Sequence, residues 1–175
     1  MEYGSLLLDS LSLAGQSVMH LLFAGRLTGK KPHAWHFALY FSLLCAISLA
    51  FAWFSPQGGG ALPIGAGVLA LYAMVRVALG GKRPVSWLAA VLGFYISQVS
   101  FGILNSVEAV LFPHFAGSPL LYLLLLAALA LFFLLCTCCY RAAGKLLGQP
   151  EGSHTLLLLF PTLFIFAAEL YVLRT

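Results

Sequence analysis

Long stretches of this chain carry no charged side chain, and that feature limits its possible folds more than any other. Residues 32–75, 84–107 and 109–140 contain no Asp, Glu, Lys or Arg. A soluble domain needs charged residues spread along its helices to cover its exterior, and soluble domains average about 25% charged residues. Here only 8% of the residues are charged and 62% are hydrophobic, with a mean hydropathy of +1.00. Lipid is therefore the expected solvent for most of the chain.

The apolar stretches have the length of membrane helices. A transmembrane helix needs roughly 20 mainly apolar residues to cross about 30 Å of hydrocarbon. Runs such as residues 120–135 lack the alternation of polar and apolar residues that the strands of a membrane barrel show. The sequence therefore predicts an all-α, polytopic membrane helix bundle, with residues 1–175 forming a single transmembrane domain. We expect about six spans, at residues 5–27, 36–54, 61–79, 85–112, 119–147 and 154–173.

The basic residues predict an orientation, because cytoplasmic loops are enriched in Lys and Arg. All but one of the nine basic residues flank the first, third and fifth predicted connections: Arg26, Lys30, Lys31, Arg76, Lys82, Arg83, Arg141 and Lys145. The second and fourth connections have none. We therefore expect a multi-pass protein of the cell membrane with both termini outside. The net charge of +4 is explained by loops that face anionic lipid headgroups, so nucleic acid is not an expected partner.

Polar residues inside the predicted spans are the candidates for function, because they are energetically costly in lipid. In the first span they recur every three or four residues and form one stripe, and in the fourth span they follow a similar spacing. The three carboxylates within the spans would all lie in the outer third of the membrane. The sequence suggests an outward-open acidic pocket that binds a cationic or hydrogen-bonding ligand, formed by Asp9, Gln16, His20, Gln98, Asn105, Glu108 and Glu169. The alternative is that these groups hydrogen-bond neighbouring helices to one another.

No catalytic residue, metal site or cofactor is expected. The chain has no phosphate-binding loop, no His-Glu-x-x-His pair and no Gly-x-Ser-x-Gly elbow. Cys136, Cys138 and Cys139 lie together, but on one helix their sulfurs point in different directions, and zinc would need ligands that converge. We interpret them as small buried or lipid-facing residues, with reversible acylation in a eukaryotic host as the alternative.

Three segments resemble the amino-terminal membrane sensor region of bacterial histidine kinases of the GHKL class, which include peptide-pheromone sensors. The segments are LFAGRLTGKK at residues 22–31, YISQVSFG at residues 95–102, and FPTLFI at residues 160–165 with ELY at residues 169–171. The resemblance implies a sensor of an extracellular ligand, such as a peptide, in the bacterial plasma membrane. It also implies a kinase module of a two-component system after Thr175, reached through a further helix, so that no enzyme activity lies within these residues.

Two other functions fit the same sequence. A small transporter subunit or substrate-binding membrane component would also need an outward cavity, and a scaffold would need none. The third predicted span contains small residues that allow helices to approach closely: Gly65, Ala66, Gly67, Ala70 and Ala73. Such a span suits a central helix or one that forms a homodimer.

The predicted pocket can be tested through its carboxylates. We expect Asp9→Asn, Glu108→Gln and Glu169→Gln, made singly, to weaken the response to an extracellular ligand, because each removes a negative charge from the pocket. Unchanged responses in all three variants, with normal expression, would rule out the pocket.

Overall fold

The computed structural model describes the backbone of residues 2–54, 61–115 and 118–147. Within these ranges it leaves out the side chains of residues 2–9, 54, 61, 101–109, 111, 112, 115 and 119. The described part of the chain is all helical, which confirms the predicted class. Five helices follow one another, each close in bounds to a predicted segment: α1 (Glu2–Thr28), α2 (Ala34–Phe54), α3 (Ala61–Val77), α4 (Arg83–Phe115) and α5 (Pro119–Leu147).

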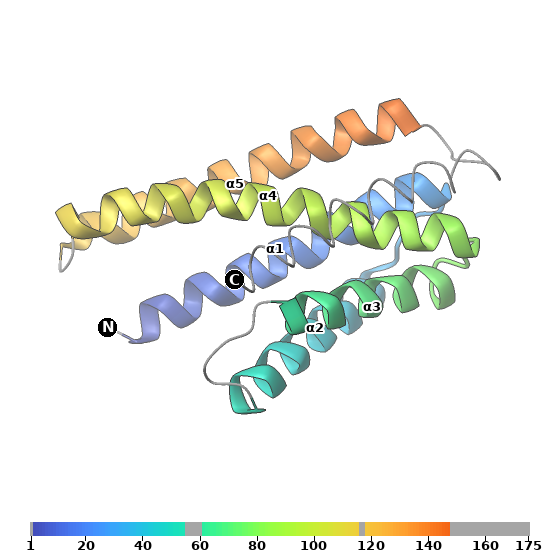
Figure 1. Ribbon diagram of the computed structural model, residues 1–175, viewed down its shortest axis with the longest axis horizontal. Helices are drawn as coiled ribbons and strands as arrows, with labels where there is room; N and C mark the ends of the chain where they lie inside the picture. Colours follow the sequence, from blue (N-terminus) through green and yellow to red (C-terminus); the bar gives the residue numbers. More distant parts are fainter. Residues whose placement is uncertain (1, 55–60, 116–117, 148–175) are drawn as a thin grey trace.

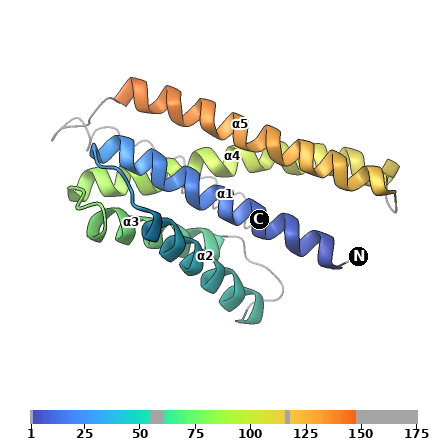
Figure 2. The ribbon, with the colours of Figure 1, turned by 180° about the vertical axis from the view of Figure 1, so that it is seen from behind.

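The five helices form an elongated bundle in which α1 and α4 occupy the centre (Figures 1 and 2). Helix α1 packs against each of the other four helices, and α4 packs against α1, α3 and α5. Helices α2 and α5 lie on the outside, on opposite sides of α1. The buried core is supplied mainly by apolar residues of α1, α3, α4 and α5, such as Leu21, Phe23, Leu71, Leu88 and Phe132.

Glycines allow close contact at two helix pairs. The Phe133 ring of α5 lies over Gly15 of α1, in the space that a Cβ at Gly15 would need. The Phe94 ring of α4 lies 2.6 Å from the position that a Cβ at Gly67 of α3 would take. The remaining small residues of α3 divide between environments: Ala70 is buried, whereas Ala73 is exposed and Gly65 has open space beside it.

Helix α1 ends in a Schellman motif, which sets the path of the chain into α2. The Gly29 amide donates to the Arg26 carbonyl over 3.4 Å, and the Lys30 amide donates to the Gly25 carbonyl over 3.0 Å. Gly29 has a φ of 69°, a left-handed conformation that glycine adopts without strain. The chain then passes so close to Gly25 that a Cβ there would lie 2.7 Å from the Lys30 carbonyl oxygen.

The prediction of about six membrane-spanning helices is wrong. In the described part of the chain, only Ala34–Trp53 in α2 and Leu120–Leu147 in α5 are long and apolar enough to cross a membrane. The apolar part of α3, Leu62–Val77, is shorter. The expected placement of both termini outside depended on the count of six. The predicted sixth span, residues 154–173, lies outside the described residues.

The error has a physical cause. The spans were predicted from the length of the apolar stretches. A helix surrounded by other helices, however, can carry polar side chains that a lipid-facing helix cannot. Helix α1 buries Ser12, Ser17 and His20, and α4 buries Ser97 and Ser100. Helix α4 also continues past Pro113, the predicted end of the fourth span, to Phe115.

Two glycine substitutions are predicted to have opposite effects on the stability of the fold, one in the Schellman motif and one inside α3. Gly29→Ala forces a Cβ into the left-handed conformation, so we expect it to destabilise the fold by about 1 kcal/mol. Gly65→Ala adds a Cβ in open space on a helix, so we expect it to stabilise the fold by about 0.5 kcal/mol or more. The midpoints of thermal unfolding in detergent, followed by circular dichroism, measure both. Equal midpoints for the two variants would contradict the strain argument.

Candidate functional site

The imidazole of His20 is fully buried and joins three helices. Its Nδ1 lies 3.1 Å from the Tyr40 hydroxyl of α2, and its Nε2 lies 3.1 Å from the Ser97 hydroxyl of α4. Both partners are themselves buried. The sequence places polar groups in α1 at intervals of three or four residues, and His20 is the member of this stripe that reaches the middle of the bundle.

The hydrogen-bond partners of His20 show which of its two ring nitrogens carries a hydrogen. Ser97 Oγ donates its single hydrogen to the Phe94 carbonyl over 2.9 Å, so it accepts a hydrogen from Nε2 of His20. Nδ1 of His20 then accepts the hydroxyl hydrogen of Tyr40. Both ring nitrogens are satisfied with the imidazole neutral, which removes most of the free-energy cost of burying a polar group.

Aromatic rings surround the imidazole. The Phe94 ring centroid lies 4.5 Å from that of His20, and the Tyr140 ring of α5 presents its edge at 6.5 Å. Tyr140 stacks on Phe23 with centroids 4.7 Å apart, and its hydroxyl donates to the Gly93 carbonyl over 2.7 Å. The cluster of His20, Tyr40, Ser97 and Tyr140, called the His20 cluster below, therefore draws on all of the long helices α1, α2, α4 and α5.

The structure places the predicted ligand-binding residues only in part. Gln16 is half-buried and its Nε2 donates to Ser12 Oγ over 3.1 Å, along α1 itself. Gln98 is half-buried on α4, one position after the serine that bonds to His20. Asp9, Asn105, Glu108 and Glu169 fall outside the described side chains. The acidic pocket thus stays a prediction, and the structure shows only that His20 links α1 to α2 and α4 by hydrogen bonds.

Sequence reasoning missed Tyr40, Ser97 and Tyr140 as members of this cluster. Tyr40 is the only tyrosine in α2, in an otherwise apolar stretch. A tyrosine hydroxyl within such a stretch needs a partner when buried, and this pattern could have identified it. Ser97 lacked such an indication, because Gln98 beside it is the more polar residue.

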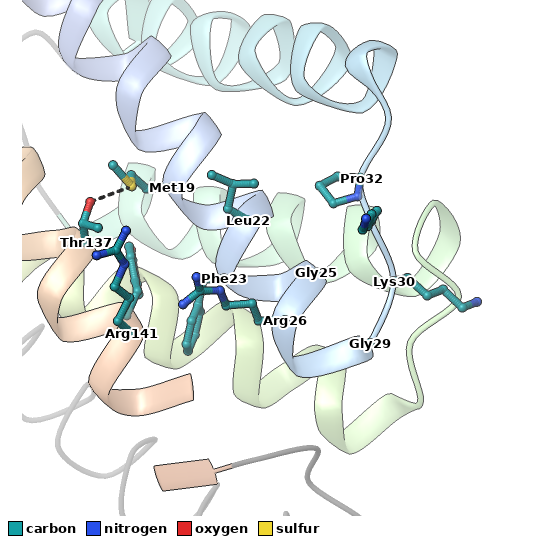
Figure 3. A pocket seen from close by; sticks show the side chains of 12 residues that line it. Met19, Leu22, Phe23, Gly25, Arg26, Gly29, Lys30, Pro32, Thr137 and Arg141 are labelled. Atoms are coloured by element: carbon teal, nitrogen blue, oxygen red, sulfur yellow. Dashed lines mark hydrogen bonds between the residues drawn. The ribbon is translucent and has the colours of Figure 1, made fainter. Parts of the chain in front are cut away.

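A cavity of about 390 Å³ lies between the ends of α1 and α5, under the α1–α2 connection (Figure 3). Its mouth is basic and its inner wall is largely apolar. The lining residues are Met19, Leu22, Phe23, Gly25, Arg26, Gly29, Lys30, Lys31, Pro32, Thr137, Tyr140 and Arg141. Among these lining residues there are four cations and no carboxylate.

The cations of the cavity belong to a larger basic end of the bundle. The last turns of α1, α3 and α5 carry Arg26, Arg76 and Lys145, and α4 begins at Arg83. Figures 1 and 2 show that these helix ends and the start of α2 all lie at the same end of the bundle. The structure thus brings basic residues from four separate parts of the sequence together.

The described residues contain no group of three or more His, Cys, Asp or Glu placed to hold a metal ion. Cys136 is buried, whereas Cys138 and Cys139 are exposed. The described part of the chain brings together a hydrogen-bonded imidazole at His20 and a group of four cations at the cavity.

The comparisons with known proteins find no relative. No protein-family model matches the chain, and neither the curated proteins nor the solved structures contain a match. The site is accordingly interpreted from its own geometry.

The His20 cluster predicts a graded loss of stability. Tyr40→Phe removes one hydrogen bond and little volume, so we expect a loss of about 1 kcal/mol. His20→Ala leaves two buried hydroxyls without their partner and opens a cavity, so we expect a loss of about 2 to 4 kcal/mol. Thermal or denaturant unfolding in detergent measures the losses, with His33→Ala at an exposed histidine as the control. A loss of stability in His33→Ala as large as that in His20→Ala would contradict the proposal that the His20 cluster stabilises the bundle more than an exposed histidine does.

Proposed function

We propose that this chain is a multi-pass membrane sensor module, in which a ligand shifts the packing of its helices. The proposal has two parts, the membrane location and the sensing role, and different observations support them. The His20 cluster is the observation that carries the sensing role.

The outer helices support the membrane location. Two helices, α2 and α5, are long and apolar enough to cross a membrane. Core helices of a soluble protein would be mostly buried, but only 17% and 28% of the residues in the most apolar stretches of α2 and α5 are buried. Lipid would cover their exposed faces. Because these two helices lie on opposite sides of α1, lipid would then surround the bundle and the chain would cross the membrane more than once.

Tryptophans at both ends of α2 support the same location. Trp35 is 57% exposed in the first turn of α2, and Trp53 is 82% exposed in its last turn. Indole rings prefer the headgroup regions on both sides of a membrane. The basic end of the bundle would then face the cytoplasm, because Lys and Arg are enriched there.

The His20 cluster supports signalling by helix movement. Signals cross packed proteins through elements that have two discrete arrangements. The imidazole bonds to hydroxyls on α2 and α4, and a third hydroxyl, that of Tyr140 on α5, belongs to a ring beside it. The Tyr140 hydroxyl already donates to the Gly93 carbonyl, so a rotation of α1 would break the bonds of the imidazole to Tyr40 and Ser97 unless α2 and α4 moved with it. A ligand that shifts one of these helices would therefore change the packing of the others.

The resemblance to the sensor regions of GHKL-class histidine kinases gives this movement an output. In that class the membrane region controls a cytoplasmic kinase, which phosphorylates a histidine and passes the phosphoryl group to a response regulator. We propose the same coupling here, with an extracellular ligand as input.

The membrane location can be tested with single cysteines in a variant that lacks the four native cysteines. If α5 crosses the membrane, cysteines at Ser118→Cys and Lys145→Cys lie on opposite sides. We expect a membrane-impermeant maleimide to label Ser118→Cys in intact cells and Lys145→Cys only after permeabilisation. Lys31→Cys, at the same end of the bundle as Lys145, is the matched control and should behave like Lys145→Cys. Labelling of both ends of α5 from one side would contradict the proposal.

The sensing role is tested first by the native reading frame after Thr175. A phosphoacceptor helix and an ATP-binding module encoded there would support it, and a stop codon directly after Thr175 would contradict it. With the kinase present, we expect His20→Leu to change basal autophosphorylation of the full-length protein in nanodiscs several-fold, and His33→Leu to leave it unchanged. Equal activity of the His20→Leu variant and the unmodified protein would show that the cluster does not transmit the signal.

A further inference from the structure

We propose that the cavity between the ends of α1 and α5 binds a phosphate group, and that the apolar inner wall accepts the hydrocarbon attached to it. The expected ligand is an anionic amphiphile, of which a phospholipid is the most abundant source in a membrane. The phosphate chemistry stands on the cavity alone, whereas the lipid source rests on the proposed membrane location.

Two arginines from different helices define the mouth of the cavity. Arg26 lies in the last turn of α1, and its Cδ passes 3.8 Å from the position that a Cβ at Gly144 of α5 would take. Figure 3 shows the Arg26 side chain extending from α1 toward α5, where Arg141 lies beside Thr137. This distance is an ordinary van der Waals contact, so the stem of the Arg26 side chain packs against α5 at Gly144. Both guanidinium groups belong to exposed residues, so an anion can reach them.

The kind of cation favours phosphate. A guanidinium group presents a planar set of donors that matches the oxygens of phosphate and can bind two of them at once. Two such groups at one cavity mouth repel each other, and a bound anion between them would relieve the repulsion. No described residue of the lining supplies a carboxylate for that purpose.

Lys30 lines the cavity but contributes less to phosphate binding than the two arginines. The Lys30 side chain extends away from the arginines in Figure 3, and its Nζ lies 2.7 Å from the position of a Cβ at Gly80, in the α3–α4 connection. Lys30 therefore adds positive charge near the cavity without directing its amine into it. The expected specificity comes from Arg26 and Arg141.

The inner wall suits hydrocarbon rather than a free inorganic ion. Met19, Leu22, Phe23 and the ring of Tyr140 line it, and Phe23 and Tyr140 are held in place by their stacking at 4.7 Å. The volume of about 390 Å³ lies in the range of small-molecule sites. It is large enough for a headgroup with the first carbons of its chains.

The position of the cavity agrees with a lipid ligand. It opens at the basic end of the bundle, where the helix ends would reach the headgroup layer if α5 crosses the membrane. Basic pockets between membrane helices on the cytoplasmic side bind anionic headgroups in other proteins. The Schellman motif at Gly29 and the close approach of the chain to Gly25 hold the connection over this cavity.

The test measures binding of three probes to the purified protein in a neutral detergent: dioleoyl phosphatidylglycerol, dioleoyl phosphatidylcholine and inorganic phosphate. We expect phosphatidylglycerol to bind more tightly than phosphatidylcholine. The double variant Arg26→Gln/Arg141→Gln should weaken phosphatidylglycerol binding about tenfold or more, because charged hydrogen bonds to the phosphate are lost. Lys82→Gln/Lys145→Gln removes the same charge at the same end of the bundle from residues that do not line the cavity, and should change binding less than about twofold.

The outcomes separate the possible sources of the phosphate. Competition by inorganic phosphate at millimolar concentration would support the site with a soluble ligand, and this result would stand even if the membrane location failed. Binding of phosphatidylglycerol without such competition would support the lipid. Equal losses in the two double variants would overturn the site in favour of diffuse attraction, and saturable binding of none of the probes would overturn it outright.

The apolar wall has its own test. Leu22 and Val18 are both exposed on α1, at 47% and 39%, but only Leu22 lines the cavity. Leu22→Gln therefore places an amide at the cavity wall, and Val18→Gln makes the same kind of change one turn earlier, outside the lining. We expect only Leu22→Gln to weaken phosphatidylglycerol binding several-fold, with inorganic phosphate unaffected by either. Equal effects of the two variants would overturn the assignment of the hydrocarbon to the inner wall.

Discussion

The hydrogen bonds of His20 are the constraint on which the arrangement of the helices depends. A buried imidazole needs hydrogen-bond partners for both ring nitrogens. An unsatisfied polar group in an apolar interior costs free energy that is large compared with the small free energy of unfolding of a domain. Because the partners are Tyr40 on α2 and Ser97 on α4, the rotation of α1 about its own axis and its depth relative to both neighbours are fixed together. Apolar contacts alone tolerate many small shifts, since they have little directionality.

The central position of α1 follows from this arrangement. With His20 hydrogen-bonded inside the bundle, α1 needs apolar neighbours on several sides, and α2 and α5 supply them from opposite directions. Those two helices have their own exposed apolar faces, which need lipid or another protein to cover them. The bundle thus has an apolar core that encloses a few polar groups, and its perimeter on α2 and α5 is apolar as well, whereas the perimeter of a soluble protein is polar. This distribution is the physical basis of the proposed membrane location.

Glycines let the functional parts approach one another. Gly15 and Gly67 accept aromatic rings from neighbouring helices, and Gly25 accepts the returning chain that covers the basic cavity. At the other side of the cavity the Arg26 side chain of α1 packs against α5 at Gly144. Two features of the bundle, the His20 cluster at its centre and the cavity at the basic end, therefore adjoin on the same α1 helix and share Tyr140. A ligand in the cavity and a rotation of α1 would influence each other for this reason.

The sequence by itself determined the positions of the five described helices to within about three residues at each end, because hydrogen bonds within a helix and breakers such as Gly29 and Gly80 act over a few residues. It also determined the clustering of basic residues in three of the connections. Only the tertiary structure decided that Ser97 rather than Gln98 meets His20, because that choice depends on the rotation of α4 against α1. The placement of Arg26 and Arg141 at one cavity likewise required α1 and α5 to be neighbours, which the sequence alone does not show. The number of membrane spans was mispredicted for the same reason, since apolar length is local whereas burial among other helices is a property of the whole bundle.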